Sequence, residues 1–519
     1  MTTRSLARDV AQMVMPRING DQLGDPRYLI QLREIIKAGI GGFILFGGTL
    51  QRTPRMLETL QALTDVPLLI ASDVERGLGQ QLAGGTRFPN QRAVASAVDR
   101  RSKRDVALLN RMLDAVRTET RAAGIHAVFS PVADVNNNPG NPIICTRAFG
   151  EEPEIVEWFS SRYIKRLQKP AGKGRLDLLA CAKHFPGHGD TDQDSHSVLP
   201  VIRADRRRLN RIELPPFREA VQDGVAMVMV AHLLVPALDP DQPTTFSKKT
   251  VTALLREGMN FDGLIVSDAL DMGALAGIHS QEEIAVRAVE AGMDILLHPH
   301  DAMATIKAVV AAVEQGRIPH DRITESVQRI MSAKNRLGLL DSMPAQEVEI
   351  DYLKNRRTAR DLSRKAVTII AGNRKQLPVS ARSGIACFIL DDDNNTESGN
   401  AFIHAMRDRY KNLSVLVMTS EAEAPESLVF DSIRAAEYCI LAIFSTISAY
   451  KGRSGIDDRL AARVVRMLRT VRETQALSVL ISFDSPYLLD RFRDADISIA
   501  AFDRMDEIQE SVAELISGR

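Results

Sequence analysis

The stretch DLLACAKHFPGHGDTDQDSH, residues 177–196, guides the fold prediction because an apolar run leads directly into a dense group of polar side chains. A continuous apolar run, rather than an alternating one, is typical of a strand buried on both faces of a parallel sheet. The run ends at Lys183 and His184, and a proline and two glycines then predict an irregular loop. The stretch therefore predicts a buried strand that carries a polar site at its carboxyl end.

Seven further apolar runs extend this pattern along the first two thirds of the chain. They cover residues 13–18, 41–48, 67–73, 126–134, 225–234, 263–270 and 293–300. Charged, amphipathic segments lie between them, and eight β/α units in about 340 residues are typical of a TIM (β/α)8 barrel with inserted loops. Polar residues end most of these runs, namely Asp73, Asp134, Lys183, His184, His232, Asp268 and His298. Since barrels of this class build their active sites at the carboxyl ends of the strands, we expect a site there.

The rest of the chain predicts a second, smaller domain. Residues 341–372 are charged and mostly helical in character, so we expect a helical connector between a barrel over 1–340 and a domain over 373–519. Five apolar runs alternate with helical segments in the second domain, at 385–390, 413–420, 438–445, 477–485 and 497–502. This rhythm predicts a three-layer α/β sandwich, and the segment has no glycine-rich nucleotide-binding motif.

Composition excludes several classes of protein. The 519 residues contain 66 basic and 66 acidic side chains, so the excess positive charge of a nucleic-acid binder is missing. The N-terminal stretch predicts no secretory signal, and no window reaches the length of a membrane-spanning helix. The four cysteines, Cys145, Cys181, Cys387 and Cys439, are scattered without metal-binding spacing. We expect a cytoplasmic protein that needs no cofactor and has neither nucleic acid nor membrane as a partner.

Within the polar loop, Asp194 and His196 stand two residues apart. In an extended segment both side chains project to the same side, so the carboxylate can accept a hydrogen bond from the imidazole. A histidine oriented in this way can donate a proton near neutral pH and take one back later. The alternative is that His196 is an ordinary histidine of a surface loop.

Asp268 ends the apolar run in FDGLIVSDALDMGAL, residues 261–275. A carboxylate at the edge of a buried sheet costs desolvation energy unless it is hydrogen-bonded or used in chemistry. We therefore consider Asp268 a candidate catalytic residue at the mouth of the barrel. The alternative is that it caps a helix that begins near Ala269.

Two further loops supply candidate ligands. Asp73 ends an earlier strand and is followed by a tight turn. Residues 130–153 form a long polar segment that is rich in asparagine and proline and contains Arg147. Long loops at the functional face of a barrel are usually binding loops, although a structural, salt-bridged arginine fits this composition equally well.

Three motifs resemble glycoside hydrolase family 3, and most closely its bacterial β-N-acetylglucosaminidase subgroup. They are AKHFPGHGDTDQDSHSVLP (182–200), DVNNNPGNPIICTRAFGEEP (134–153) and FDGLIVSDALDMGAL (261–275). The resemblance covers about residues 10–340, and VLISFDSPYLLDRF (479–492) is similar to the second α/β domain of many members. It implies an exo-acting enzyme that removes terminal β-linked N-acetylglucosamine from carbohydrates such as peptidoglycan or chitin fragments.

The resemblance also implies a role for individual residues. Asp268 matches the nucleophile that forms a covalent glycosyl-enzyme, and Asp194 with His196 matches the dyad that protonates the leaving group. The positions that bind the hydroxyls of the terminal sugar correspond to Asp73, Arg147, Lys183 and His184. One departure is the stretch DVERGLGQQL (73–82), where Gln81 stands near the place of an expected sugar-binding arginine.

Several alternatives remain at this stage. A β-glucosidase or other exo-β-glycosidase of the same family would take its catalytic glutamate from the second domain. A β-N-acetylglucosaminide phosphorylase is possible because a neutral histidine, unlike a carboxylate, would not repel phosphate. An enzyme of a different class, a metal-dependent barrel hydrolase, would use His184, His188 and Asp190 as ligands.

Overall fold

The structure is a computed structural model that describes residues 3–172, 174–341, 349–422 and 424–518. Contacts between residues divide the chain into two units. The first comprises Met1–Phe88, Asn110–Asn138 and Ala148–Arg356, and the second comprises Pro89–Leu109, Pro139–Arg147 and Arg357–Arg519. Two segments embedded in the sequence of the first unit therefore belong, by their contacts, to the second.

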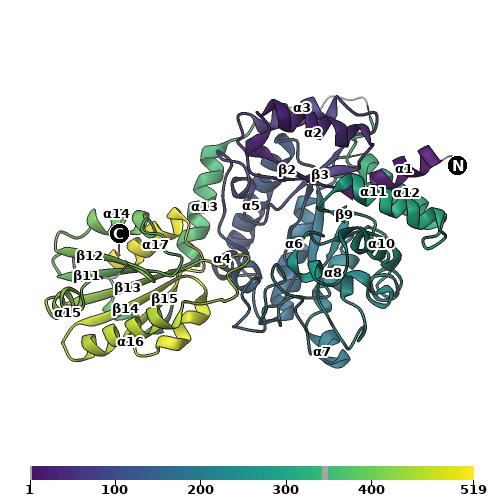
Figure 1. The fold of residues 1–519 in the computed structure, drawn as a ribbon. Coiled ribbons are helices and arrows are strands. Elements are labelled where there is room, and N and C mark those ends of the chain that lie inside the picture. The colour runs from purple at the N-terminus through teal and green to yellow at the C-terminus, as the bar shows by residue number, and fades with distance from the viewer. Residues whose placement is uncertain (1–2, 173, 342–348, 423, 519) are drawn as a thin grey trace. The chain divides into compact units, whose positions relative to one another are not determined.

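The first unit is built on a curled parallel sheet (Figure 1). Its seven strands lie in the order β2 (Arg17–Asn19), β3 (Gly42–Phe46), β4 (Leu69–Ser72), β5 (Ala127–Val128), β6 (Leu179–Phe185), β7 (Met227–Val230) and β8 (Leu264–Ser267). Two shorter strands, β1 (Val14–Met15) and β9 (Leu296–Leu297), pair with each other in parallel. A single parallel bridge between Val266 and Ile295 links β8 to the start of β9. All eight predicted runs thus contain strands, and Pro16 separates β1 from β2 within the first.

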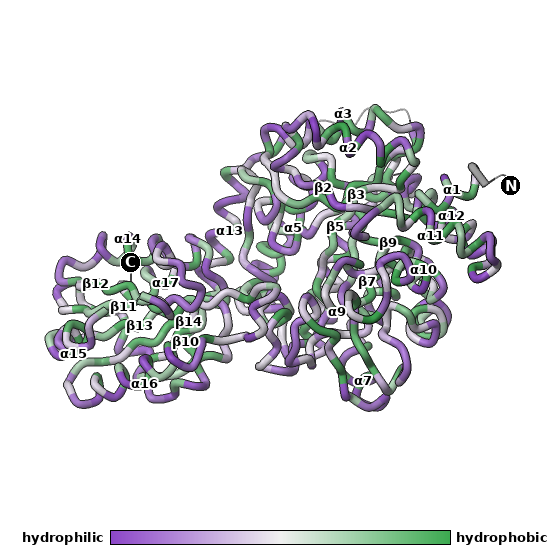
Figure 2. Tube along the Cα trace, in the orientation of Figure 1, coloured by the Kyte–Doolittle hydropathy of each residue, from purple (hydrophilic) through white to green (hydrophobic). Residues whose placement is uncertain are grey.

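Helices cover this sheet. They are α1 (Thr3–Gln12), α2 (Pro26–Lys37), α3 (Thr53–Gln61), α5 (Lys103–Ala122), α6 (Pro153–Leu167), α7 (Arg206–Arg211), α8 (Pro215–Gln222), a π-helix (Lys249–Gly258), α9 (Gly273–Ala276), α10 (Gln281–Ala291), α11 (Ala302–Glu314) and α12 (His320–Arg336). Local sequence explains where several begin: the Asp25 carboxylate accepts from the Arg27 N–H ahead of α2, and Ser280 caps α10. All seven residues of β6 are buried, and Figure 2 shows hydrophobic strands beneath mixed helices.

The second unit contains a six-stranded mixed sheet. Its order is β10 (Thr368–Gly372), β15 (Ile497–Ala500), β14 (Leu477–Asp484), β13 (Tyr438–Ser445), β11 (Ile385–Asp391) and β12 (Leu413–Thr419). The unit also contains α4 (Gln91–Ala97), α14 (Asn400–Arg407), α15 (Glu426–Arg434), α16 (Asp458–Arg472) and α17 (Asp506–Ser517). Helices α14 and α17 pack together on one face of the sheet, and α15 and α16 on the other (Figure 1).

The expected connector over 341–372 differs from the structure at its end. Residues 342–348 lie outside the described part, and α13 (Tyr352–Ala366) is helical as expected. The last residues instead form β10, which pairs antiparallel with β15. This strand escaped prediction because it is short and its burial is only partial, as is common for an edge strand. Among the described residues, no helix is long and apolar enough to cross a membrane.

Candidate active site

Strand β6 carries Lys183 near its carboxyl end, and this residue lies between two carboxylates. The Lys183 ammonium is 2.7 Å from Asp73 Oδ1 and 2.8 Å from Glu75 Oε1. The side chains of Lys183 and Glu75 are 3% and 6% exposed, whereas that of Asp73 is 26% exposed. Two carboxylates compensate the burial of the cation, and Asp73 keeps oxygen surface available for a ligand. Glu75 was not predicted as a site residue, because its sequence position indicates only a turn.

His184, next along β6, is held by a buried carboxylate. Its Nδ1 lies 2.7 Å from Asp134 Oδ2, and the backbone N–H groups of His184 and His188 donate to Asp134 Oδ1 at 3.2 and 2.7 Å. Burial raises the pKa of Asp134, but the charge and hydrogen bond of His184 and the contacts with His188 outweigh it and lower the pKa. An ionised Asp134 accepts a hydrogen bond from the Nδ1–H of His184 and so orients the ring.

Asp268 follows β8 and is poised as an ionised carboxylate. Its N–H donates to the Val230 carbonyl at 2.9 Å, and its Oδ1 accepts from the Ala269 N–H at 2.8 Å. Burial raises the pKa of Asp268, but the electrostatic influence of His184 and His232 and the hydrogen bond from the Ala269 N–H outweigh it and lower the pKa. No helix begins at Ala269, since α9 starts at Gly273, so Asp268 is not a helix cap.

The structure brings Asp194 and His196 together as expected. His196 Nδ1 lies 2.8 Å from Asp194 Oδ1, and the Asp194 side chain is 2% exposed whereas that of His196 is 27% exposed. The expected extended conformation is wrong, because the N–H groups of Ser197 and Val198 donate to the Asp194 carbonyl and form a turn. The aspartate accepts from the His196 backbone N–H as well, at 2.9 Å, which is typical of an Asx turn.

This loop lies close to Asp268. The His196 carbonyl accepts from the Gly273 N–H at 3.1 Å, and the Ser195 carbonyl accepts from the Ala274 N–H at 3.2 Å. The positive charge of His196 is also one of the influences that lower the pKa of Asp268. A candidate nucleophile and a candidate proton donor therefore meet at the same end of the sheet.

His232 is a supporting residue that the sequence marked only by its place at a strand end. It is fully buried, with Nε2 2.9 Å from the Ala269 carbonyl and Nδ1 2.6 Å from Thr245 Oγ1. A carbonyl can only accept, so Nε2 carries the proton and Thr245 donates to Nδ1. Burial lowers the pKa of His232, which agrees with a neutral ring that orients the peptide next to Asp268.

Two further predicted residues, Arg147 and Gln81, make hydrogen bonds to backbone groups. Arg147 belongs to the second unit, in a short turn (Cys145–Arg147), where its Nη1 donates to the Ile143 carbonyl at 3.2 Å. Gln81 donates to the Asp73 carbonyl at 2.9 Å and accepts from the Gly47 N–H at 3.4 Å. Gln81 thus links two strand ends through an uncharged amide.

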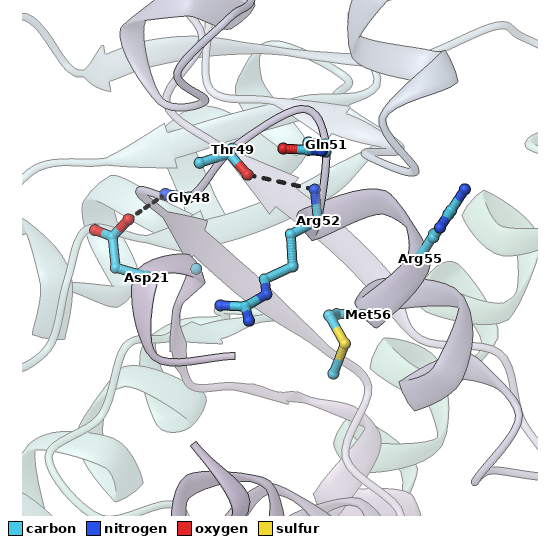
Figure 3. A pocket seen from close by; sticks show the side chains of 8 residues that line it. Asp21, Gly48, Thr49, Gln51, Arg52, Arg55 and Met56 are labelled. Atoms are coloured by element: carbon cyan, nitrogen blue, oxygen red, sulfur yellow. Dashed lines mark hydrogen bonds between the residues drawn. The ribbon is translucent and has the colours of Figure 1, made fainter. Parts of the chain in front are cut away.

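A pocket of about 550 Å³ includes Gly48, the residue that follows Gly47 (Figure 3). It is lined by Gly20, Asp21, Gly48, Thr49, Gln51, Arg52, Arg55 and Met56. Asp21 Oδ1 accepts from the Gly48 N–H at 3.0 Å, and Thr49 Oγ1 accepts from the Arg52 N–H at 3.3 Å. None of the predicted catalytic residues lines this pocket, so it is not the centre of the candidate site.

The residues proposed as metal ligands are engaged otherwise. His184 contacts Asp134, His188 Nε2 lies 3.1 Å from Ser195 Oγ, and Asp190 pairs with Arg208 at 2.6 Å. In the part of the chain that the structure describes, no group of three or more histidine, cysteine or acidic side chains is placed to hold a metal ion.

Comparisons with known proteins identify the family of the chain. The family model described as the glycosyl hydrolase family 3 N-terminal domain matches residues 5–333. Beta-hexosaminidase A of Pseudoalteromonas piscicida is 28% identical over 486 residues, covering 87% of this chain and 79% of the relative. A beta-hexosaminidase of Chromobacterium violaceum is 35% identical over 308 residues, covering 57% and 81%.

A solved structure extends the similarity to both units. The glycoside hydrolase family 3 β-N-acetylglucosaminidase from Paenibacillus sp. is 27% identical, with a TM-score of 0.83, and the match covers 99% of this chain and 96% of that one. The family model alone spans more than half of the 519 residues. The chain therefore belongs to glycosyl hydrolase family 3.

Proposed function

We propose that the protein is a retaining exo-β-N-acetylglucosaminidase. The observation that carries the proposal is the convergence of an ionised Asp268 with the Asp194–His196 pair at one end of the sheet. A retaining glycosidase needs a nucleophile on one face of the anomeric carbon and a proton donor at the glycosidic oxygen. The relatives named beta-hexosaminidase and the similar β-N-acetylglucosaminidase structure support the choice of sugar.

In the first step, Asp268 attacks the anomeric carbon and His196 gives its proton to the departing oxygen. Asp194 stabilises the charged imidazole and holds it in one orientation, as a carboxylate does in a catalytic triad. In the second step, neutral His196 takes a proton from water, which attacks the glycosyl-enzyme and releases the sugar with retained configuration.

Three further residues are proposed to bind the terminal sugar. Asp73 and Lys183 form an ion pair at the carboxyl ends of β4 and β6, and Asp134 orients the ring of His184, the residue that follows Lys183. Charged hydrogen-bonding groups of this kind suit sugar hydroxyls, which both donate and accept. Arg147 is proposed as a fourth ligand on the resemblance of its motif alone.

We also propose that the curled sheet of the first unit closes into a TIM (β/α)8-type barrel. The pairing of β1 with β9, the bridge from Val266 to Ile295 and the donation of the Ile44 N–H to the Pro16 carbonyl support closure. Helices on both faces of the second sheet support a three-layer α/β sandwich over about 373–519. The motifs further support peptidoglycan or chitin fragments as substrates. A cytoplasmic location is part of the proposal because the four cysteines are free, as is usual in a reducing compartment.

The test compares hydrolysis of the p-nitrophenyl β-glycosides of N-acetylglucosamine and glucose. We expect wild type to prefer the N-acetyl sugar, Asp268→Ala to lose measurable turnover, and His196→Ala to lose about 10²- to 10⁴-fold, the usual contribution of a general acid. The matched control is His404→Ala, since the His404 side chain is 83% exposed in the second unit. A preference for glucose, or full activity of His196→Ala, would contradict the proposal.

Phosphate is a second acceptor that the site favours. After the first step His196 is neutral, so it does not repel an anion as a carboxylate base would. We expect added phosphate to yield some glycosyl phosphate beside the free sugar. Products analysed by mass spectrometry without any glycosyl phosphate would exclude phosphorolysis while leaving the hydrolase proposal intact.

A further inference from the structure

A buried histidine, His188, lies between the end of β6 and the turn that carries the proposed acid/base pair. His188 is 2% exposed, and its Nε2 lies 3.1 Å from the hydroxyl of Ser195, which is itself 3% exposed. Ser195 stands between Asp194 and His196 in the sequence. Ser195 is bonded directly to both members of the dyad, so a contact that fixes Ser195 also restrains Asp194 and His196.

Several contacts hold the backbone and ring of His188 in place. Its N–H donates to Asp134 at 2.7 Å, and the same carboxylate holds the His184 ring. The rings of His184 and His188 meet edge to face, with centroids 6.0 Å apart. The following residue, Gly189, packs so closely on the Asp134 segment that a Cβ atom there would lie 1.7 Å from the Val135 carbonyl oxygen. His188 thus has little freedom to move relative to β6.

The other side of Ser195 faces the loop after Asp268. The Ser195 carbonyl accepts from the Ala274 N–H, and the His196 carbonyl accepts from the Gly273 N–H. These two backbone bonds join the turn to the loop after Asp268, and the Ser195 side chain joins it to His188. Losing the side-chain bond would remove the hydrogen bond that ties this turn to the residues after β6.

A neutral His188 can keep its hydrogen bond to Ser195 throughout the catalytic cycle. Burial lowers its pKa to about 4, although the nearby Asp134 carboxylate acts in the opposite direction. A ring that remains neutral keeps the same hydrogen bond to Ser195 while a catalytic histidine gains and loses its proton. The support is therefore independent of the catalytic cycle.

We propose that His188 is a positioning residue for the acid/base, and that its hydrogen bond to Ser195 sets the orientation of the Asp194–His196 dyad toward the glycosidic oxygen. The inference rests on the proposed function. It gives His188 a supporting role in proton donation by His196, and not a role in binding a metal or the sugar. Proton donation is sensitive to geometry, and a misplacement of about 1 Å can cost about 10²-fold in rate.

The experiment uses substrates with different leaving groups. A poor leaving group such as phenol needs a proton from the enzyme, whereas dinitrophenol departs without one. We expect Ser195→Ala to lose about 10- to 100-fold in kcat/KM on the phenyl glycoside and little on the dinitrophenyl glycoside. Ser195→Thr and His188→Gln keep groups able to make the bond, and we expect both to remain close to wild type on the two substrates.

The matched control is Ser197→Ala, because Ser197 is an exposed serine of the same turn. We expect it to match wild type, and a thermal unfolding midpoint for every variant separates misfolding from mispositioning. An equal loss of Ser195→Ala on both substrates, or no loss at all, would overturn the inference. If His196→Ala itself shows no dependence on the leaving group, the proposed acid/base fails instead, so the two failures are distinguishable.

Discussion

At the scale of single residues, Gly189 fixes how closely the polar loop approaches the segment after β5. A Cβ at Gly189 would lie 1.7 Å from the Val135 oxygen and 2.5 Å from its carbon. Because these are backbone atoms, they cannot rotate away, and Gly189→Ala must push the loop outward. We expect about 10²-fold lower kcat/KM, since the dyad moves with the loop, and a loss of about 1–3 kcal/mol in the free energy of unfolding.

The control for this substitution is Gly277→Ala. A Cβ at Gly277 would meet nothing within 4 Å, and its backbone needs no left-handed conformation. We expect Gly277→Ala to keep the wild-type kcat/KM on the p-nitrophenyl β-glycoside of N-acetylglucosamine. Unchanged activity of Gly189→Ala would show that the loop finds its working position without this close packing.

Single residues also show what the sequence could and could not predict about the site. Strand-end positions identified Lys183, His184 and Asp268, because the ends of parallel strands meet at one edge of the sheet. The same reasoning found the Asp194–His196 pair but gave it an extended backbone, whereas the chain turns there. The bond of Asp134 to the His188 N–H joins residues 54 positions apart, and no spacing rule predicts it.

At the scale of elements, continuous apolar runs were sufficient to predict the interior strands. Burial on both faces makes every position apolar, and β6, β11 and β8 are buried throughout. The pattern is weaker at the edges of the second sheet: it predicted the edge strand β12 but missed β10, in which no residue is buried. The partly exposed β10 was therefore expected to be connector.

One buried carboxylate, Asp294, ties strand β8 to helix α12. It accepts from the Ile265 N–H at 3.0 Å and from the Ser326 hydroxyl at 2.7 Å. It also pairs with three arginines, Arg256, Arg322 and Arg329, at 2.6, 3.1 and 3.3 Å. Its side chain is fully buried, so its removal leaves several donors without their acceptor.

We expect Asp294→Ala to lower the free energy of unfolding by about 3 kcal/mol, the lower end for breaking a buried ion pair, because the arginines are partly exposed. The measurement is urea unfolding followed by tryptophan fluorescence. The only tryptophan, Trp158, lies in α6, so the signal reports the first unit.

The matched control for Asp294 is Glu283→Ala. Glu283 pairs with Arg317 and Arg287, but its side chain is 32% exposed, and surface pairs of this kind contribute about 0–1 kcal/mol. Equal losses for the two variants would mean that burial does not set the value of the Asp294 network.

At the scale of the whole molecule, buried neutral histidines make stability depend on pH. His126 is 6% exposed, and its Nδ1 accepts from the Ile70 N–H at 3.1 Å. Burial, followed by the charges of Arg121 and Lys334, lowers its pKa from 6.5 to about 3. His188 behaves alike, with a pKa lowered to about 4.

The direction of the pH effect on stability follows from the pH at which His126 becomes protonated in the folded and in the unfolded protein. As pH falls below 6.5, His126 of the unfolded chain becomes protonated, whereas in the folded protein it stays neutral until about pH 3. The unfolded state therefore binds more protons in this window, and stability falls as the solution becomes more acidic. The stability contribution is fully present above pH 6.5.

We expect His126→Asn, whose amide oxygen can accept from the Ile70 N–H, to reduce this acid sensitivity. One fewer proton taken up on unfolding corresponds to a slope smaller by about 1.4 kcal/mol per pH unit. The comparison is the free energy of unfolding of variant and wild type between pH 6 and pH 4, from the Trp158 signal, within the window set by the His126 pKa of about 3. The exposed His404→Asn should leave the slope unchanged, because the His404 side chain is 83% exposed in the folded protein. Equal slopes for His126→Asn and wild type would show that the folded protein protonates His126 as readily as the unfolded chain does, and that the interior around it admits a charge.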